Sequence, residues 1–143
     1  VSSAEAQRFV EIATATVESV KEQGPLDGEA FAMALEAAAM TVNGEAIRWL
    51  VGKEVKITTK GDVYNRSWDV ASYEAVLHKE LEREYQKNMI VLAIKKGCTS
   101  VRAISAEIGV DLLRVSYLLA DLEKTNRVEF TGMEDSKPVF AAL

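Results

Sequence analysis

The sequence contains little of what catalytic and cofactor sites usually need. Its 143 residues include one cysteine, Cys98, and one histidine, His78. A single cysteine can neither form an intramolecular disulfide nor hold a cluster that needs four ligands. A lone histidine leaves Ser-His-Asp and Cys-His arrangements without a second residue to support them. We therefore expect no catalytic residue, no metal site and no cofactor in this chain.

Long apolar runs and glycine-rich loops are also missing. No uninterrupted apolar stretch approaches the roughly twenty residues of a membrane span. The eight glycines are scattered and form no phosphate-binding motif. The residues are 48% hydrophobic and 27% charged, a composition typical of globular proteins. The missing apolar span argues against a membrane protein, and the single cysteine fits the reduced cytoplasm, where we expect this protein to lie.

The net charge of −5 is unevenly distributed along the chain. Residues 84–143 carry eight basic and eight acidic residues, whereas residues 1–83 carry nine basic and fourteen acidic ones. Proteins that bind nucleic acid use cationic groups to release counterions from the phosphates. The charge balance therefore disfavours DNA as a partner, although it leaves room for a local basic patch.

Helical patterns dominate the first half of the chain, and we expect a helical region over residues 1–72. Ser2-Ser3-Ala4-Glu5 has the pattern of a capping box at the start of a first helix. Apolar residues at three- and four-residue steps then give this helix one apolar stripe. Gly24-Pro25 ends it, because glycine adopts the left-handed conformation readily and proline cannot continue a helix.

Two further helices and a short arm are expected before the chain reaches its longest helix. Asp27 is placed to cap a second helix, which is apolar on nearly all sides and stops at Asn43-Gly44. Residues 46–51 predict a short third helix. Over residues 53–68 β-branched residues alternate with polar ones and a turn follows, which predicts a short hairpin or an irregular arm.

A long helix connects the two halves of the chain. Asp69 caps it, an apolar stripe runs along it from Tyr73 to Leu92, and Gly97 ends it. Its first residues belong to the helical region and its last residues to the C-terminal part. We place the domain boundary at residue 72, within the first turn of this helix.

The C-terminal part has the element order of a winged helix-turn-helix domain, which we assign to residues 73–143. Thr99 or Ser100 caps a short helix, Gly109 supplies the turn, and Asp111 caps a third helix. The residues that this third helix is expected to direct into the core are Leu112, Val115, Leu118, Leu119 and Leu122.

Two strands with a wing between them complete this order. Residues 127–131 and 138–142 have the composition of strands, and the polar segment 132–137 is the expected wing. The predicted fold is therefore mostly α with a small β-wing: an N-terminal helical region followed by a C-terminal winged helix-turn-helix domain.

The outward face of the third helix is the surface that enters the major groove in DNA-reading proteins of this kind. Base readers prefer Arg, Asn, Gln or Ser there, because base edges offer donors and acceptors. Here Leu113 and Tyr117 form an apolar pair, Asp121 opposes the basic residues, and the wing carries Glu134 and Asp135. We predict a protein partner, which would contact Leu113, Arg114, Tyr117 and Ala120.

Two alternatives remain open for this face, because winged helices serve both as repressors and as docking modules. In the first, the chain is a DNA-binding transcription regulator that dimerises through its acidic N-terminal helices. The residues that would then contact DNA are Arg102, Arg114, Ser116, Tyr117 and Lys124. In the second, Leu113 belongs to the core and the rest of the face is merely solvated.

Residues 1–26 carry a more specific pattern, in which a Ser-rich step precedes a helix that opens with Glu, a basic residue and Phe and ends at Gly-Pro. The residues that fit it are Ser2, Glu5, Arg8, Phe9, Gly24 and Pro25. This pattern resembles the tail of hydrogenase iron–sulfur subunits, the delta subunits of methyl-viologen-reducing hydrogenases, which also occur fused to heterodisulfide reductase A-type flavoproteins. Ala6 departs from it, since glycine is commoner there. The resemblance covers under a fifth of the chain.

The resemblance implies a parent protein that passes electrons between a hydrogenase or formate dehydrogenase and a heterodisulfide reductase-like flavoprotein. Because the sequence starts at Val1 rather than Met, we expect it to be a piece of such a parent, with the cluster-binding cysteines upstream. None of those cysteines can be transferred to this sequence. The expected function is a non-catalytic module that docks onto other subunits of the redox complex or onto a second copy of itself.

Overall fold

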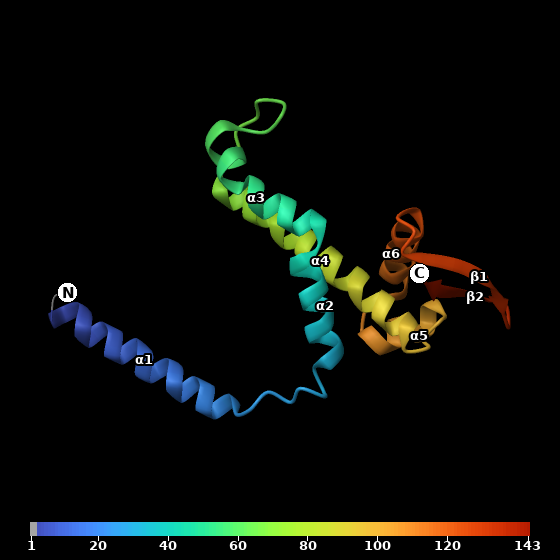
Figure 1. Ribbon diagram of the computed structural model, residues 1–143, viewed down its shortest axis with the longest axis horizontal. Coiled ribbons are helices and arrows are strands. Elements are labelled where there is room, and N and C mark those ends of the chain that lie inside the picture. Colours follow the sequence, from blue (N-terminus) through green and yellow to red (C-terminus); the bar gives the residue numbers. More distant parts are fainter. Residues whose placement is uncertain (1–2) are drawn as a thin grey trace. The chain divides into compact units, whose positions relative to one another are not determined.

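The structure, a computed structural model, describes residues 3–143 and is mostly helical (Figure 1). The elements within this range are α1 (Ser3–Gln23), α2 (Ala32–Asn43), α3 (Glu45–Lys60), α4 (Val70–Lys95), α5 (Val101–Ile108), α6 (Leu112–Lys124), β1 (Val128–Glu134) and β2 (Lys137–Ala142). The chain divides into two compact units, Val1–Ala32 and Met33–Leu143. Among the described helices, none is both long and apolar enough to traverse a bilayer. The expected mostly α composition with a small β element is confirmed.

The first unit contains α1, whose apolar stripe faces solvent. Gly24 follows the helix with a φ of 70°, and its N–H donates to the carbonyl oxygen of Val20 at 3.2 Å, which confirms the predicted stop. The stripe consists of Ala6, Phe9, Val10, Ala13, Val17 and Val20, of which only Ala13 is half-buried. The predicted capping box of Ser2 and Glu5 lies outside the residues whose side chains are described.

Asp27 organises the turn that leads into α2. Its Oδ1 accepts hydrogen bonds from the backbone N–H groups of Glu29 at 3.1 Å and Ala30 at 3.0 Å. The helix itself starts at Ala32, later than a simple cap at Asp27 would place it. It ends at Asn43, immediately before Gly44, as the sequence predicts.

The predicted hairpin or arm over residues 53–68 is wrong in its first half, because α3 continues from Glu45 to Lys60. The strand preference of its β-branched residues is weak and depends on a neighbouring strand, whereas this segment continues a helix that packs on α4. Helical spacing buries Ile47 and half-buries Leu50 where α3 packs on α4. Tyr73 of α4 is only 3% exposed, and its hydroxyl donates to the carbonyl oxygen of Leu50 at 2.7 Å.

One carboxylate organises the loop between α3 and α4, residues 61–69. Asp62 accepts hydrogen bonds from the backbone N–H groups of Tyr64 at 2.9 Å and Arg66 at 3.0 Å. It also accepts from Nε of Arg66 at 2.7 Å and from Nε1 of Trp68 at 3.3 Å. The Arg66 guanidinium, with these other donors, holds the pKa of Asp62 far below its ordinary value. The irregular part of the predicted arm is confined to this loop.

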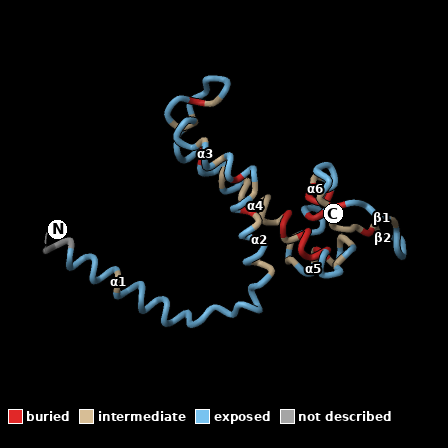
Figure 2. The backbone as a smooth tube through the Cα atoms, viewed as in Figure 1, coloured by how far each residue is buried: buried red, intermediate tan, exposed pale blue. Residues whose placement is uncertain are grey.

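The core of the second unit lies where the end of α4 meets α5, α6 and β1 (Figure 2). Its buried residues are Ile90, Val91, Ala93, Ile94, Ile104, Val115, Leu118, Leu119, Leu122 and Val128. Four of the five residues predicted to point inward from the third helix are among them. Leu112 is the exception: it is 46% exposed, because it lies in the first turn of α6 at the edge of the buried stripe.

The two strands form an antiparallel hairpin that is longer than predicted. Its turn is only Asp135-Ser136, both with positive φ, so most of the expected polar wing over 132–137 is strand. The register shifts between Phe130 and Gly132. The rings of Phe130 and Phe140 pack edge to face across the hairpin, with centroids 5.9 Å apart.

Candidate functional site

The outward surface of α6 presents two large apolar side chains to solvent. Leu113 is 64% exposed and Tyr117 is 68% exposed, and they lie one helical turn apart. Ala120, also exposed, follows one turn later. We call Leu113, Arg114, Tyr117 and Ala120 the α6 face. The alternative in which Leu113 belongs to the core is wrong, because the buried stripe occupies the other side of the helix.

Local sequence positions this face. The carboxylate of Asp111 accepts hydrogen bonds from the backbone N–H groups of Leu113 at 3.0 Å and Arg114 at 3.1 Å, so it caps α6 as predicted. Gly109 precedes it with a φ of 67°, which allows the tight turn after α5. The start of α6, and with it the orientation of its first outward residue, is therefore fixed by the turn and the cap.

Arg114 points back towards α4. Its Nε donates to Oε1 of Gln86 at 2.8 Å, although Gln86 and Arg114 are far apart in the sequence. This contact holds one side of the guanidinium against the protein. The Nε of Arg114 is therefore engaged in a contact within the protein, at the edge of the α6 face.

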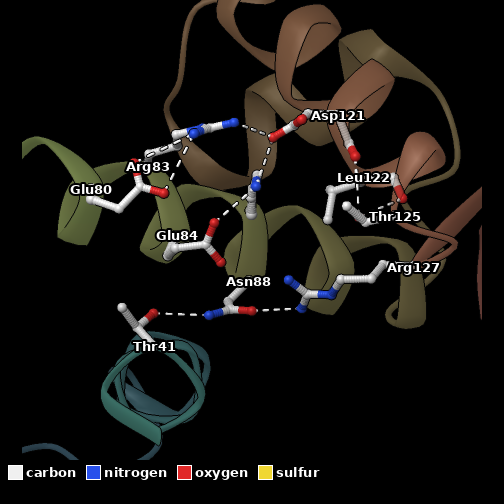
Figure 3. Close-up of polar contacts among 10 residues, drawn as sticks. Thr41, Glu80, Arg83, Glu84, Asn88, Asp121, Leu122, Thr125 and Arg127 are labelled. Carbon is white, nitrogen blue, oxygen red and sulfur yellow. Dashed lines mark hydrogen bonds and ion pairs between the residues drawn. The ribbon is translucent and has the colours of Figure 1, made fainter. Parts of the chain in front are cut away.

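Asp121 ties α6 to α4 (Figure 3). Its Oδ2 lies 2.6 Å from a terminal nitrogen of Arg83 and 2.7 Å from Nζ of Lys87. Lys87, only 7% exposed, also contacts Oε1 of Glu84 at 2.8 Å. Lys87 and then Arg83 lower the pKa of Asp121, and the hydrogen bond that Arg83 donates to Asp121 raises the pKa of Arg83. The negative charge of Asp121 is thus neutralised by two cations of α4. The sequence pattern had instead predicted that Asp121 would offset the basic residues of α6 itself.

A second polar bridge joins three parts of the unit through Asn88 (Figure 3). Asn88 is 3% exposed; its Nδ2 donates to Oγ1 of Thr41 on α2 at 2.9 Å. Its Oδ1 accepts from a terminal nitrogen of Arg127, just before β1, at 2.7 Å. Asn88 is not among the residues predicted from the sequence to have a role. Its position on the apolar stripe of α4, between Leu81 and Leu92, is the signal that could have revealed it.

The residues of the DNA-binding alternative come from separate places in the unit. Arg102 is exposed on α5, whereas Arg114 and Lys124 lie near the two ends of α6, about 15 Å apart along the helix axis. Ser116 is exposed, and its hydroxyl donates to the carbonyl oxygen of Leu112 within the helix. At the tip of the hairpin Glu134 and Asp135 are exposed. An acidic tip repels the phosphates that a wing would contact.

The residues with the most reactive side chains lie in different surroundings. Cys98 is half-buried against the core, and His78 is exposed on α4. Within residues 3–143 no group of three or more His, Cys, Asp or Glu side chains could hold a metal ion.

Comparison with family models, with curated proteins and with solved structures finds no match to this chain. The geometry of its surfaces is therefore the basis for proposing a function.

The Asp121 contacts make the stability of the second unit depend on pH in the acidic range. Because the folded-state pKa of Asp121 lies below its ordinary value of 3.8, the carboxylate stabilises the fold above pH 3.8. This stabilisation is lost as the pH falls through the lower folded-state pKa. At pH 7 we expect Asp121→Asn to lower the free energy of unfolding, because it removes the charge that Arg83 and Lys87 contact. The loss should be only about 1 kcal/mol, since solvent screens this partly exposed group.

Urea denaturation of the native protein and of Asp121→Asn at a series of pH values measures this effect. The difference between the two proteins should shrink as the medium becomes strongly acidic, where the native carboxyl group is protonated. Glu123→Gln, an exposed carboxylate on the same helix, is the matched control and should differ little from the native protein at any pH. A difference for Asp121→Asn that does not change with pH would contradict the assignment.

Proposed function

We propose that the second unit is a non-catalytic protein-docking module with a winged helix-turn-helix fold, and that it binds its partner through the α6 face. The fold proposal rests on the order of α4, α5, α6, β1 and β2 and on the shared core of the three helices and β1. The observation that carries the docking proposal is the pair of exposed side chains, Leu113 and Tyr117, one turn apart on α6. Tyrosine is among the residues that contribute most to protein interfaces.

Charge supports a protein partner over DNA. The basic residues on the outward side of α6 are Arg114, whose Nε is bonded to Gln86, and Lys124 in the last turn. The hairpin tip adds the exposed carboxylates of Glu134 and Asp135. A surface with an apolar centre and mixed charges around it is typical of a protein interface, whereas a polyanion needs a cationic one.

The resemblance of residues 1–26 supports one kind of partner. Helix α1 ends at Gln23, directly before Gly24-Pro25, which agrees with the helix that the hydrogenase subunit pattern requires. We therefore propose that the module docks onto other subunits of a cytoplasmic electron-transfer complex that is similar to hydrogenase–heterodisulfide reductase assemblies. In this proposal the redox chemistry belongs to the parent complex.

The double substitution Leu113→Ser with Tyr117→Ser tests the proposal. The native protein should co-elute in size-exclusion chromatography with co-expressed hydrogenase and heterodisulfide reductase-like subunits from the same organism. The double variant should bind at least about tenfold more weakly, because it removes both apolar anchors from the interface. Glu123→Ser is the matched control on the same helix and should bind like the native protein. Co-elution of the double variant at native strength would show that the α6 face is not the interface.

A fluorescence-anisotropy titration with mixed-sequence duplex DNA tests the transcription-regulator alternative. If the second unit docks onto a protein, the native chain should show no tight, salt-sensitive binding to this DNA. Binding that weakens steeply with added salt, and that is lost when Arg102 and Lys124 are replaced by alanine, would support the regulator and contradict the docking proposal.

A further inference from the structure

The second unit contains a cleft of about 850 Å³ away from the α6 face. The end of α2, the first half of α3 and the middle of α4 form its walls, and Asn88 and Arg127 also line it. Its volume falls in the range of sites that hold ligands or partner side chains. The cleft is open, so an extended or helical segment of another protein can reach it.

One wall of the cleft is apolar and includes a tryptophan that faces water. Trp49 is 57% exposed, although burial of an indole ring is strongly favourable. Met40, Leu50 and Val76 line the cleft beside it. None of these side chains has a role in the core of the helices α4 to α6. An exposed aromatic ring in an apolar cleft is typical of a docking site.

Carboxylates outnumber cations in the lining of the cleft, and Arg48 adds one further positive charge in the hollow that shares Glu45 and Trp49. Glu45, Glu80 and Glu84 line the cleft, against Arg127 as the one basic residue in its lining. Arg127 donates to Asn88, so its charge is held at the cleft floor. Glu80 and Glu84 each pair with one cation of their own helix, Arg83 at 3.4 Å and Lys87 at 2.8 Å. Within residues 3–143 Glu45 forms no ion pair.

We propose that this Trp49 cleft docks a basic, amphipathic segment of a partner protein. An arginine of the segment would lay its aliphatic stem and guanidinium against the ring of Trp49, with its charge towards Glu45 and Glu80. Arginine fits better than lysine, because its planar group stacks on aromatic rings and is more weakly hydrated. This site goes beyond the proposed function and uses none of the α6 face, so either can fail without the other.

A fluorescein-labelled amphipathic peptide of leucine, alanine and arginine is the probe, and the same peptide with glutamate in place of arginine is its charge control. We expect saturable anisotropy with the arginine peptide and none with the glutamate peptide. Trp49→Ala should weaken binding about tenfold through loss of the cation–π contact and the apolar wall. Glu45→Gln with Glu80→Gln should weaken it about fivefold.

Two controls separate this site from other surfaces. Glu82→Gln, an exposed carboxylate on α4 that does not line the cleft, and the double serine variant of the α6 face should both bind the arginine peptide like the native protein. Tighter binding of the glutamate peptide, no saturable binding of either peptide, or equal losses for Glu82→Gln and Glu45→Gln with Glu80→Gln would overturn the proposal.

Nuclear magnetic resonance on the unmodified protein keeps the test valid if Trp49→Ala does not fold. The chain has two tryptophans, and Trp68 is engaged with Asp62 in the loop after α3. The indole N–H signal of Trp49 should shift on addition of the arginine peptide, while that of Trp68 stays in place. A shift of Trp68 alone, or of neither signal, would overturn the proposal.

Discussion

Leu119→Ala is expected to lower the free energy of unfolding of the second unit by about 3 kcal/mol. Leu119 is 1% exposed and lies in the core shared by α4, α5, α6 and β1. Truncation removes buried methyl groups and leaves a cavity that the closely packed surroundings fill only in part. Urea denaturation of the full chain, followed by circular dichroism, measures the loss as a shift of the midpoint.

Leu113→Ala is the matched control for this prediction, because it makes the same chemical change on the same helix. Leu113 is 64% exposed, so its truncation should cost less than about 0.5 kcal/mol. Equal costs at the two positions would mean that the outward side of α6 is packed inside the protein. A small stability cost for Leu113→Ala also supports the binding test. If replacing Leu113 weakens docking without unfolding the protein, the loss of binding reflects a lost contact.

Asn88→Ala is expected to cost about 2 kcal/mol of unfolding free energy, although the residue is polar and lies on a helix. Asn88 is 3% exposed and bonds to Thr41 on one side and to Arg127 on the other. Alanine removes the acceptor of Arg127 and the amide that donates to the buried Thr41 hydroxyl, and it leaves a gap at a buried position. Hydrogen exchange should speed up in α2, because one of its contacts with α4 is lost.

Asn43→Ala provides the comparison for Asn88. Asn43 is exposed near the end of α2, and its amide donates only to the carbonyl oxygen of Ala39 in its own helix. We expect Asn43→Ala to lower the free energy of unfolding by less than about 0.5 kcal/mol. If Asn88→Ala proved as stable as Asn43→Ala, the bridge between α2, α4 and β1 would have no role in stability.

These tests converge on α4, which holds both candidate surfaces of the second unit. Arg83 and Lys87 fix α6 through Asp121, and Asn88 holds α2 and the residue before β1. Glu80 of the same helix lines the Trp49 cleft. A partner that binds either surface therefore contacts elements that are anchored to the same helix.

Most of the starts and ends of the helices could be predicted from the sequence, because they depend on contacts between residues a few positions apart. Asp69, Ser100 and Asp111 cap their helices with side-chain oxygens that accept backbone N–H groups within three residues. Gly24 and Gly109 follow helices with the positive φ that glycine adopts without strain. The inward residues of α6, apart from Leu112, were predictable from their periodicity.

Other features depended on which segments the chain brings together. The length of α3 was not predictable from its own residues, because its β-branched segment favours a strand locally but continues a helix that packs on α4. The partners of Asp121 and Asn88 lie about forty residues away along the chain. Trp49, Glu45 and Glu80 meet only because α3 packs beside α4.

The amino-acid sequence by itself determined where most helices begin and end, which side of α6 is buried, and that two large apolar residues occupy its other side. Only the tertiary structure decided which charges are matched internally and which surfaces remain open to a partner. The physical reason is distance along the chain. Caps and periodicity act over a few residues, whereas ion pairs, buried amides and clefts join segments whose proximity exists only after folding.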